Sequence, residues 1–127
     1  MTVARRWPRK DEMLLYPLLN TCRPMIDLQH ALEERIASMM EEDGGLVASP
    51  EIMDDWCAIH YHDSSGNMVR CEFLETERSW RNRDAVQDYN DLIDQGVEVV
   101  VIVPEAVMGA VDRYLGMFAH PDIQLSS

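Results

Sequence analysis

The fold is decided by "DWCAIHYHDSSGNMVRCEFLETERSW", residues 55–80. Its parts "DWCAIHYHD" and "MVRCEFLETE" are rich in β-branched and aromatic residues and alternate in character, which is typical of strands. The "SSGN" between them has the small and glycine residues of a hairpin turn. Carboxylates stand at both ends of the hairpin. They form either a metal site or only the polar surface of an ordinary hairpin.

Helices are expected before the hairpin. "KDEMLLYPLLNTC", residues 10–22, predicts a first helix with Asp11 as N-cap and Pro17 inside it. "RPMIDLQHALEERIASMMEEDGG", residues 23–45, has apolar residues at helical spacing and predicts a second helix that stops at its glycine pair. "LVASPEIMDDW", residues 46–56, is a link that contains a short strand or a turn.

The chain after the hairpin alternates helix and strand. "RSWRNRDAVQDYNDLIDQG", residues 78–96, carries an apolar stripe and predicts a helix closed by its last glycine. "VEVVVIVP", residues 97–104, is almost continuously apolar, as expected for a strand that is covered on both faces. "EAVMGAVDRYLGMF", residues 105–118, predicts a final helix, and "HPDIQLSS", residues 120–127, an edge strand. We expect one α/β (α+β) domain over residues 1–127, with a single mixed sheet.

Length and composition agree with a globular domain. The chain has 127 residues, of which 46% are hydrophobic and 27% charged. A chain of this length buries roughly two-thirds of the surface that its unfolded form exposes, which is enough for a core. Its three cysteines form no CxxC pair, and no apolar run has the roughly 18 residues of a membrane span. We therefore expect a cytoplasmic protein with reduced thiols, no membrane contact and a flexible basic start over residues 1–10.

The chain is strongly acidic, with 23 acidic and 11 basic residues and a net charge of −12. Such a field repels a phosphate backbone unless cations gather on one face. They do gather in two short stretches, "ARRWPRK" and "RSWRNR". Both are interpreted as solvated surface, with weak nucleic-acid contact through Arg78, Arg81 and Arg83 as the alternative. Lys10 is the single lysine of the sequence.

The order of hairpin, helix and Val-rich strand resembles the core of the PD-(D/E)XK superfamily, also called the restriction-endonuclease-like fold. The resemblance covers about residues 50–115. It rests on Asp55, Gly66 and Glu72, followed by "AVQDYNDLIDQGVEVVVIVP". It implies that the hairpin lies beside a parallel Val-rich strand and that Asp55 and Glu72 come together to hold Mg²⁺ or Mn²⁺. Such a metal activates water for attack on a phosphodiester.

The sequence departs from the family pattern at its lysine. That lysine stands two residues beyond the second acid, on the same face of the strand. Here Leu74 follows Glu72 at this spacing, and Glu75 is followed by a further glutamate. Arg70 shares a face with Glu72 and is the candidate substitute, although its pKa prevents it from acting as a base. Asp55 and Glu72, with Glu75 third, are the catalytic candidates if the protein is active.

His60 and His62 also share a strand face. Two histidines at this spacing can ligate a metal, but they are interpreted as a solvent-facing pair.

Three functions from different classes follow. The first is a nuclease-like fold without catalysis that acts as an interaction or regulatory module, with a protein partner or a second copy of itself and no required cofactor. The second is an active divalent-metal nuclease that uses Asp55 and Glu72. The third is an unrelated small regulatory α/β protein whose hairpin acids are only surface.

Overall fold

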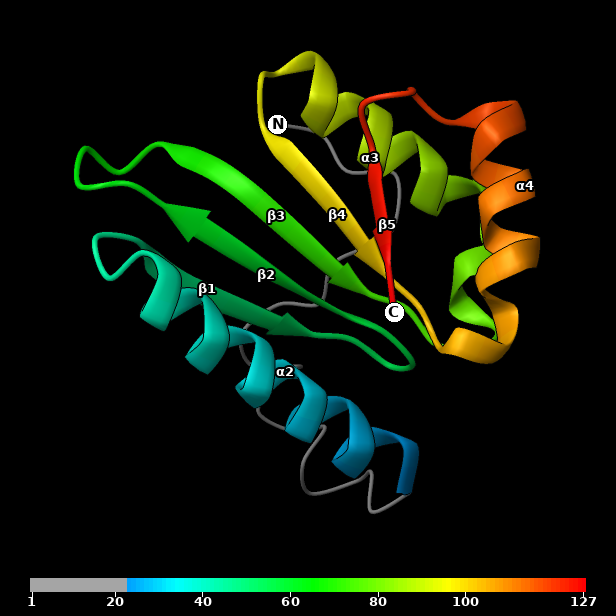
Figure 1. The fold of residues 1–127 in the computed structure, drawn as a ribbon, viewed down its shortest axis with the longest axis horizontal. Coiled ribbons are helices and arrows are strands. Elements are labelled where there is room, and N and C mark those ends of the chain that lie inside the picture. Colours follow the sequence, from blue (N-terminus) through cyan, green and yellow to red (C-terminus); the bar gives the residue numbers. More distant parts are fainter. Residues whose placement is uncertain (1–22) are drawn as a thin grey trace.

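A five-stranded mixed sheet forms the centre of the molecule (Figure 1). The computed structural model describes the backbone from residue 23 to residue 127 and the side chains from residue 28 onward. The helix expected over residues 10–22 and the basic start lie outside the described residues. The elements, in chain order, are α2 (Arg23–Glu42), β1 (Val47–Ile52), β2 (Cys57–His62), β3 (Met68–Leu74), α3 (Arg83–Asp94), β4 (Glu98–Ile102), α4 (Met108–Phe118) and β5 (Gln124–Ser126).

The strands lie in the sheet in chain order. β1, β2 and β3 form an antiparallel meander, whereas β4 runs parallel to β3 and β5 parallel to β4. The expectation of a mixed sheet with a hairpin beside a parallel Val-rich strand is therefore confirmed. The link over residues 46–56 contains a six-residue strand, β1, which carries Pro50. Proline has no N–H to donate to a ladder, and it is tolerated here because β1 is an edge strand.

The hairpin turn is longer than the two residues of the tightest type. Five residues separate β2 from β3, and the Asp63 carboxylate accepts hydrogen bonds from the backbone N–H groups of Ser65 and Asn67, at 2.9 and 3.0 Å. Gly66 has a φ of +85°, a conformation that costs glycine nothing. The turn chemistry predicted from "SSGN" is thus confirmed, with an aspartate side chain completing it.

The helices cover the two faces of the sheet separately. α2 packs on one face, where it buries Leu28, Leu32 and Met39 against β2 and the end of β3. α3 and α4 pack on the other face, where Phe73 and Tyr89 meet edge to face with their ring centroids 4.8 Å apart. β4 is buried from both sides, as its continuous apolar sequence predicts. Figure 1 shows α2 beside β1 and β2, and α3 and α4 together on the side of β4 and β5.

Candidate functional site

Glu72 occupies the middle of β3 and is completely buried on the face that α2 covers. Arg35 donates to both of its carboxylate oxygens, from Nε to Oε1 at 3.2 Å and from Nη2 to Oε2 at 2.7 Å. Arg70 donates to Oε2 from Nε at 3.0 Å and from Nη2 at 2.8 Å. The Tyr61 hydroxyl donates to Oε1 at 3.2 Å. We call these four residues the Glu72 cluster.

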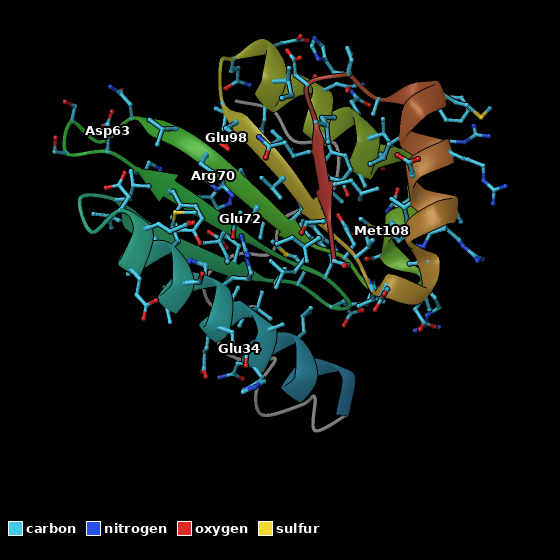
Figure 2. All side chains as sticks on the ribbon, viewed as in Figure 1. Glu34, Asp63, Arg70, Glu72, Glu98 and Met108 are labelled. Carbon is cyan, nitrogen blue, oxygen red and sulfur yellow. The ribbon has the colours of Figure 1, made fainter. Side chains whose placement is uncertain are left out.

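The local sequence explains how the cluster forms. Arg70 stands two residues before Glu72, so both side chains leave β3 on the same face. Tyr61 lies opposite Arg70 in the antiparallel register and points to that face from β2. Arg35 comes from α2, where it stands three residues after Leu32, one helical turn along the buried stripe. Figure 2 shows Arg70 and Glu72 beside each other on β3, with Glu98 of β4 close by. Glu98 accepts a further hydrogen bond from Arg70.

Electrostatics keep Glu72 ionised. Burial alone would raise the pKa of its carboxyl group, but the hydrogen bonds from Arg35 and Arg70 outweigh burial and lower that pKa. The same contact raises the pKa of Arg35. Burial, and then the negative charge of Glu72, raises the pKa of Tyr61, so its hydroxyl stays protonated and donates. The cluster thus holds one buried anion between two guanidinium groups, as a buried charge requires.

The carboxylate of Glu72 has little capacity left for a cation. A carboxylate offers about four lone-pair sites, and the five donated hydrogen bonds described above occupy both oxygens. Two positive charges also lie within hydrogen-bonding distance, and they repel a divalent ion. In this arrangement Glu72 accepts hydrogen bonds from its ion-pair partners and has no oxygen left open for a metal.

Asp55, the predicted partner of Glu72, lies before the start of β2 and is half-buried. The register places Glu72 opposite Ile59, four residues beyond Asp55. Asp55 itself lies in the bend between β1 and β2, before Cys57, where the ladder with β3 begins. In the part of the chain that the structure describes, no group of three or more His, Cys, Asp or Glu side chains is arranged to hold a metal. Metal binding by Asp55 and Glu72 remains a prediction.

Glu75, the third candidate, lies just beyond the end of β3 and is almost fully buried. Its Oε1 accepts from the Ser79 hydroxyl at 2.7 Å, and its Oε2 accepts from the Tyr89 hydroxyl. The Ser79 hydroxyl oxygen in turn accepts from the backbone N–H of Thr76 at 2.8 Å. Glu75 therefore ties the 3₁₀ turn Ser79–Arg81 and helix α3 to the end of the central strand.

Leu74, which stands where the family pattern has its lysine, lies in an apolar environment. Leu74 projects on the same face as Glu72 and is buried against α2 in the cluster that contains Leu28 and Leu32. The candidate substitute, Arg70, uses three of its nitrogens on Glu72 and Glu98. Its guanidinium is therefore engaged in ion pairs on both sides.

The histidines and cysteines of the hairpin are half-buried or buried. His60 and His62 share a face with Trp56 and Ala58, as predicted, and both are half-buried rather than fully solvent-facing. Burial, and then the charge of His62, lowers the pKa of His60, and its Nδ1 lies 3.7 Å from the sulfur of Cys71. Burial raises the pKa of the Cys57 thiol to about 12. A thiol with such a pKa is inert, which agrees with its predicted role as a small buried hydrophobe.

The predicted basic stretch lies beside an aromatic cleft. The Arg81 guanidinium carbon stands 5.4 Å from the centroid of the Trp80 ring, whose other neighbour is Tyr114, edge to face at 5.6 Å. Arg83 lines a cavity of about 570 Å³ together with Val86, Tyr114 and Phe118. Arg81 and Arg83 belong to the predicted basic stretch, whereas no sequence pattern pointed to the rings of Tyr114 and Phe118.

Arg35 and Tyr61 were also missed as site residues. A signal for Arg35 exists in the sequence, because it is a cation on the stripe of α2 that carries Leu28, Leu32 and Met39. A charge on a buried stripe predicts a buried partner of opposite sign. No comparable signal points to Tyr61, since a tyrosine in a strand is ordinary.

Comparisons of the chain with protein-family models, curated proteins and solved structures find no match. Among the helices of the described residues, none combines the length and apolar character needed to cross a membrane.

Proposed function

We propose that the protein is a non-catalytic interaction or regulatory module built on a nuclease-like fold. The observation that carries the proposal is the saturation of Glu72, since the acid that would coordinate a metal in an active relative is held by two arginines and a tyrosine. The burial of Leu74 at the lysine position supports the same conclusion. A site of this composition holds α2 to the sheet and lacks a group to activate water.

The element order supports the fold part of the proposal. A helix, a three-stranded meander, a second helix and a strand parallel to β3 follow one another, which is the arrangement that the resemblance implies around a hairpin and a Val-rich strand. Asp55 lies in the bend before β2, outside the ladder that pairs Ile59 with Glu72, and this placement gives an active site no support. An unrelated regulatory α/β protein would have the same binding role but no kinship with nucleases.

Metal-dependent cleavage separates the proposal from the active nuclease. Single- and double-stranded DNA and RNA are incubated with the whole protein and Mg²⁺ or Mn²⁺, and Mn²⁺ binding is followed by paramagnetic broadening of amide signals. We expect no cleavage and no broadening around Glu72. Cleavage that disappears in Asp55→Asn would overturn the proposal. Asp55 is the informative position because it lies outside the Glu72 cluster, so its substitution leaves the buried ion pairs intact.

A second function, weak contact with single-stranded nucleic acid, is favoured by the cleft around Arg81 and Arg83. Aromatic rings that stack bases and cations that pair with phosphates are the chemistry of such sites, and here Tyr114 and Phe118 line a cavity with Arg83. The net charge of −12 opposes the contact. We therefore expect binding of a fluorescent oligothymidine at low salt only, with loss in Arg81→Ala/Arg83→Ala and not in Arg113→Ala. Equal binding by both variants would exclude this site.

A further inference from the structure

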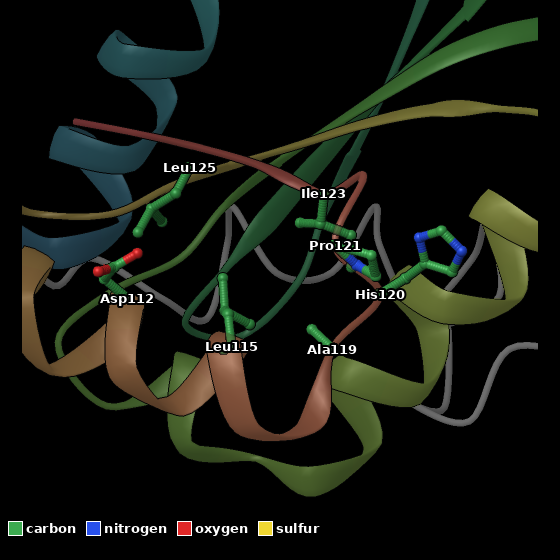
Figure 3. Close-up of a pocket in the computed structure, with 8 residues that line it drawn as sticks. Asp112, Leu115, Ala119, His120, Pro121, Ile123 and Leu125 are labelled. Atoms are coloured by element: carbon green, nitrogen blue, oxygen red, sulfur yellow. The ribbon is translucent and has the colours of Figure 1, made fainter.

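A groove runs between α4 and β5 at the edge of the sheet (Figure 3). Leu115, Gly116 and Ala119 form its helix side, and Ile123 and Leu125 form its strand side. Asp112 lies at one end of the row of lining residues and His120 at the other. The cavity measures about 260 Å³, below the roughly 300 Å³ at which small-molecule pockets begin. Its size suits one or two aliphatic side chains of a polypeptide better than a separate ligand.

The backbone of β5 is open along this groove. Within the described residues, β5 pairs with β4 on one side and with no strand on the other. The carbonyl of Ser126 accepts from the N–H of Val103, at 3.0 Å, so Ser126 and Gln124 direct their backbone groups toward β4. Successive residues of a strand direct these groups to opposite edges. The N–H and C=O of Leu125 therefore point outward, while its side chain lies in the groove.

The charges around the groove select its occupant. Asp112 is exposed at the groove. Asp122 follows its other end with 76% of its side chain exposed, and its carboxylate lies 3.7 Å from Nδ1 of His120. The nearest cation in sequence, Arg113, projects about 100° around the helix from Asp112. With a net charge of −12 for the whole chain, the surroundings favour a cationic partner.

We propose that an extended, basic segment of a partner protein docks along β5 as a sixth strand. It hydrogen-bonds to the N–H and C=O of Leu125, places an aliphatic side chain in the groove against Leu115 and Ile123, and directs a lysine or arginine to Asp112. Strand addition of this kind takes affinity from main-chain hydrogen bonds and specificity from pockets for alternate side chains. The inference rests on the proposed interaction role and deepens it by naming the class of partner.

Two glycines of α4 provide a matched test. A Cβ added at Gly116, in the groove, or at Gly109, outside it, meets no other atom within 4 Å. Gly116→Leu therefore adds a side chain at the wall of the groove and Gly109→Leu does not, and neither position has a positive φ that would strain a side chain. The probe is a set of octapeptides in which lysine alternates with valine, leucine or isoleucine, and binding to the ¹⁵N-labelled whole protein is followed by amide chemical shifts.

We expect the largest shifts at residues 112–126 and unchanged affinity for Gly109→Leu. Gly116→Leu should lose binding at least tenfold. Asp112→Asn should bind the peptides roughly two- to fivefold more weakly, as for the loss of an exposed ion pair. Peptides with glutamate in place of lysine should not bind. No shifts, shifts that map to β1, equal binding of the acidic set, or unchanged affinity in Gly116→Leu would overturn the inference. Shifts of β5 on protein dilution alone would instead assign the groove to a second copy. Because none of these readouts depends on cleavage, a nuclease result would refute the proposed function without deciding this one.

Discussion

Replacing Glu72 by glutamine should strongly destabilise the protein. The change removes the charge that Arg35 and Arg70 share and leaves the shape of the side chain almost unchanged. The amide can still accept the hydrogen bond of Tyr61, but its NH₂ group faces guanidinium donors. Two cations are then left on the covered face of the sheet with no buried anion.

The expected magnitude follows from burial. Breaking a fully buried pair costs about 3–5 kcal/mol of unfolding free energy. The side chains of Arg35 and Arg70 are 34% and 18% exposed, so water partly solvates both, and about 2–4 kcal/mol is expected after that discount. With a urea dependence of about 1–3 kcal/mol per molar, the unfolding midpoint should fall by roughly 1–2 M.

Urea unfolding can be followed by the fluorescence of Trp56 and Trp80, which are buried in the opposite core. The matched control is Glu98→Gln, which removes a charge from the same arginine, Arg70, at a side chain that is 45% exposed. It should cost less than about 1 kcal/mol. A free energy of unfolding for Glu72→Gln within about 0.5 kcal/mol of the wild type would refute the stabilising role of the buried ion pairs. An equal loss in Glu98→Gln would refute it as well.

Acid gives an independent measure of the same interaction. The pKa of Glu72 in the folded protein lies below its ordinary value of 4.5. A carboxyl group with a lowered pKa stabilises the fold above its unfolded-state pKa, and this stabilisation is lost as the pH falls through the folded-state pKa. The wild type should therefore lose more unfolding free energy below pH 4.5 than Glu72→Gln does. Parallel acid profiles would contradict an ionised, arginine-paired Glu72.

Three further predictions concern the hairpin and the helix ends. The pKa of His60 is lowered below 6.5 in the folded protein, so the unfolded chain binds the proton more readily as the pH falls below 6.5. The free energy of unfolding should therefore decline in that range in the wild type, and less in His60→Asn. Urea midpoints measured across the range will test this. The Cys57 thiol has a pKa of about 12, so it should react with iodoacetamide at pH 8 only after the protein unfolds. Labelling is measured by mass spectrometry in a Cys22→Ser background. Rapid labelling of Cys57 in the folded protein would contradict the prediction. Gly96 has a φ of +83°, so Gly96→Ala should lower the free energy of unfolding by about 1 kcal/mol. Gly109→Ala in α4 should not lower it. Equal urea midpoints of the two variants would argue against the left-handed conformation at Gly96.

The sequence predicted the sheet well because its signals are local. The continuous valines of β4 predict a strand covered on both faces, and the structure confirms this. The residues around Ile59 and Phe73 correctly predict strands, but most of β2 and β3 is buried on both faces although their sequence alternates. Residues 46–56 predict either a short strand or a turn, because this mixed segment has no clear period and contains Pro50. Its strand conformation comes from pairing with β2, a tertiary contact that no local pattern records.

The candidate site was less predictable because its partners come from separate elements. Spacing along β3 correctly placed Arg70 and Glu72 on one face. The convergence of Asp55 with Glu72 depends on the path of the bend before β2 and stays a prediction, while the register of the hairpin places Ile59 opposite Glu72. The hairpin loop and the irregularity between Tyr61 and His62 set that register, and their detail exceeds what turn propensities convey.

The distribution of charge explains why binding is expected at an edge of the sheet and not at its centre. An exposed acid in the middle of β3 would attract cations, but Glu72 is neutralised where it lies and is shielded by α2. Asp112 and Asp122 have no arginine among their described contacts, although the Asp122 carboxylate lies 3.7 Å from Nδ1 of His120, and they flank a groove beside an open strand. Since only uncompensated charge acts at a distance on a partner, the proposed basic segment should be attracted to the groove between α4 and β5 rather than to Glu72. The acid that stabilises the interior is thus in the central strand β3, whereas the acids proposed to attract a partner lie on α4 and in the loop before β5.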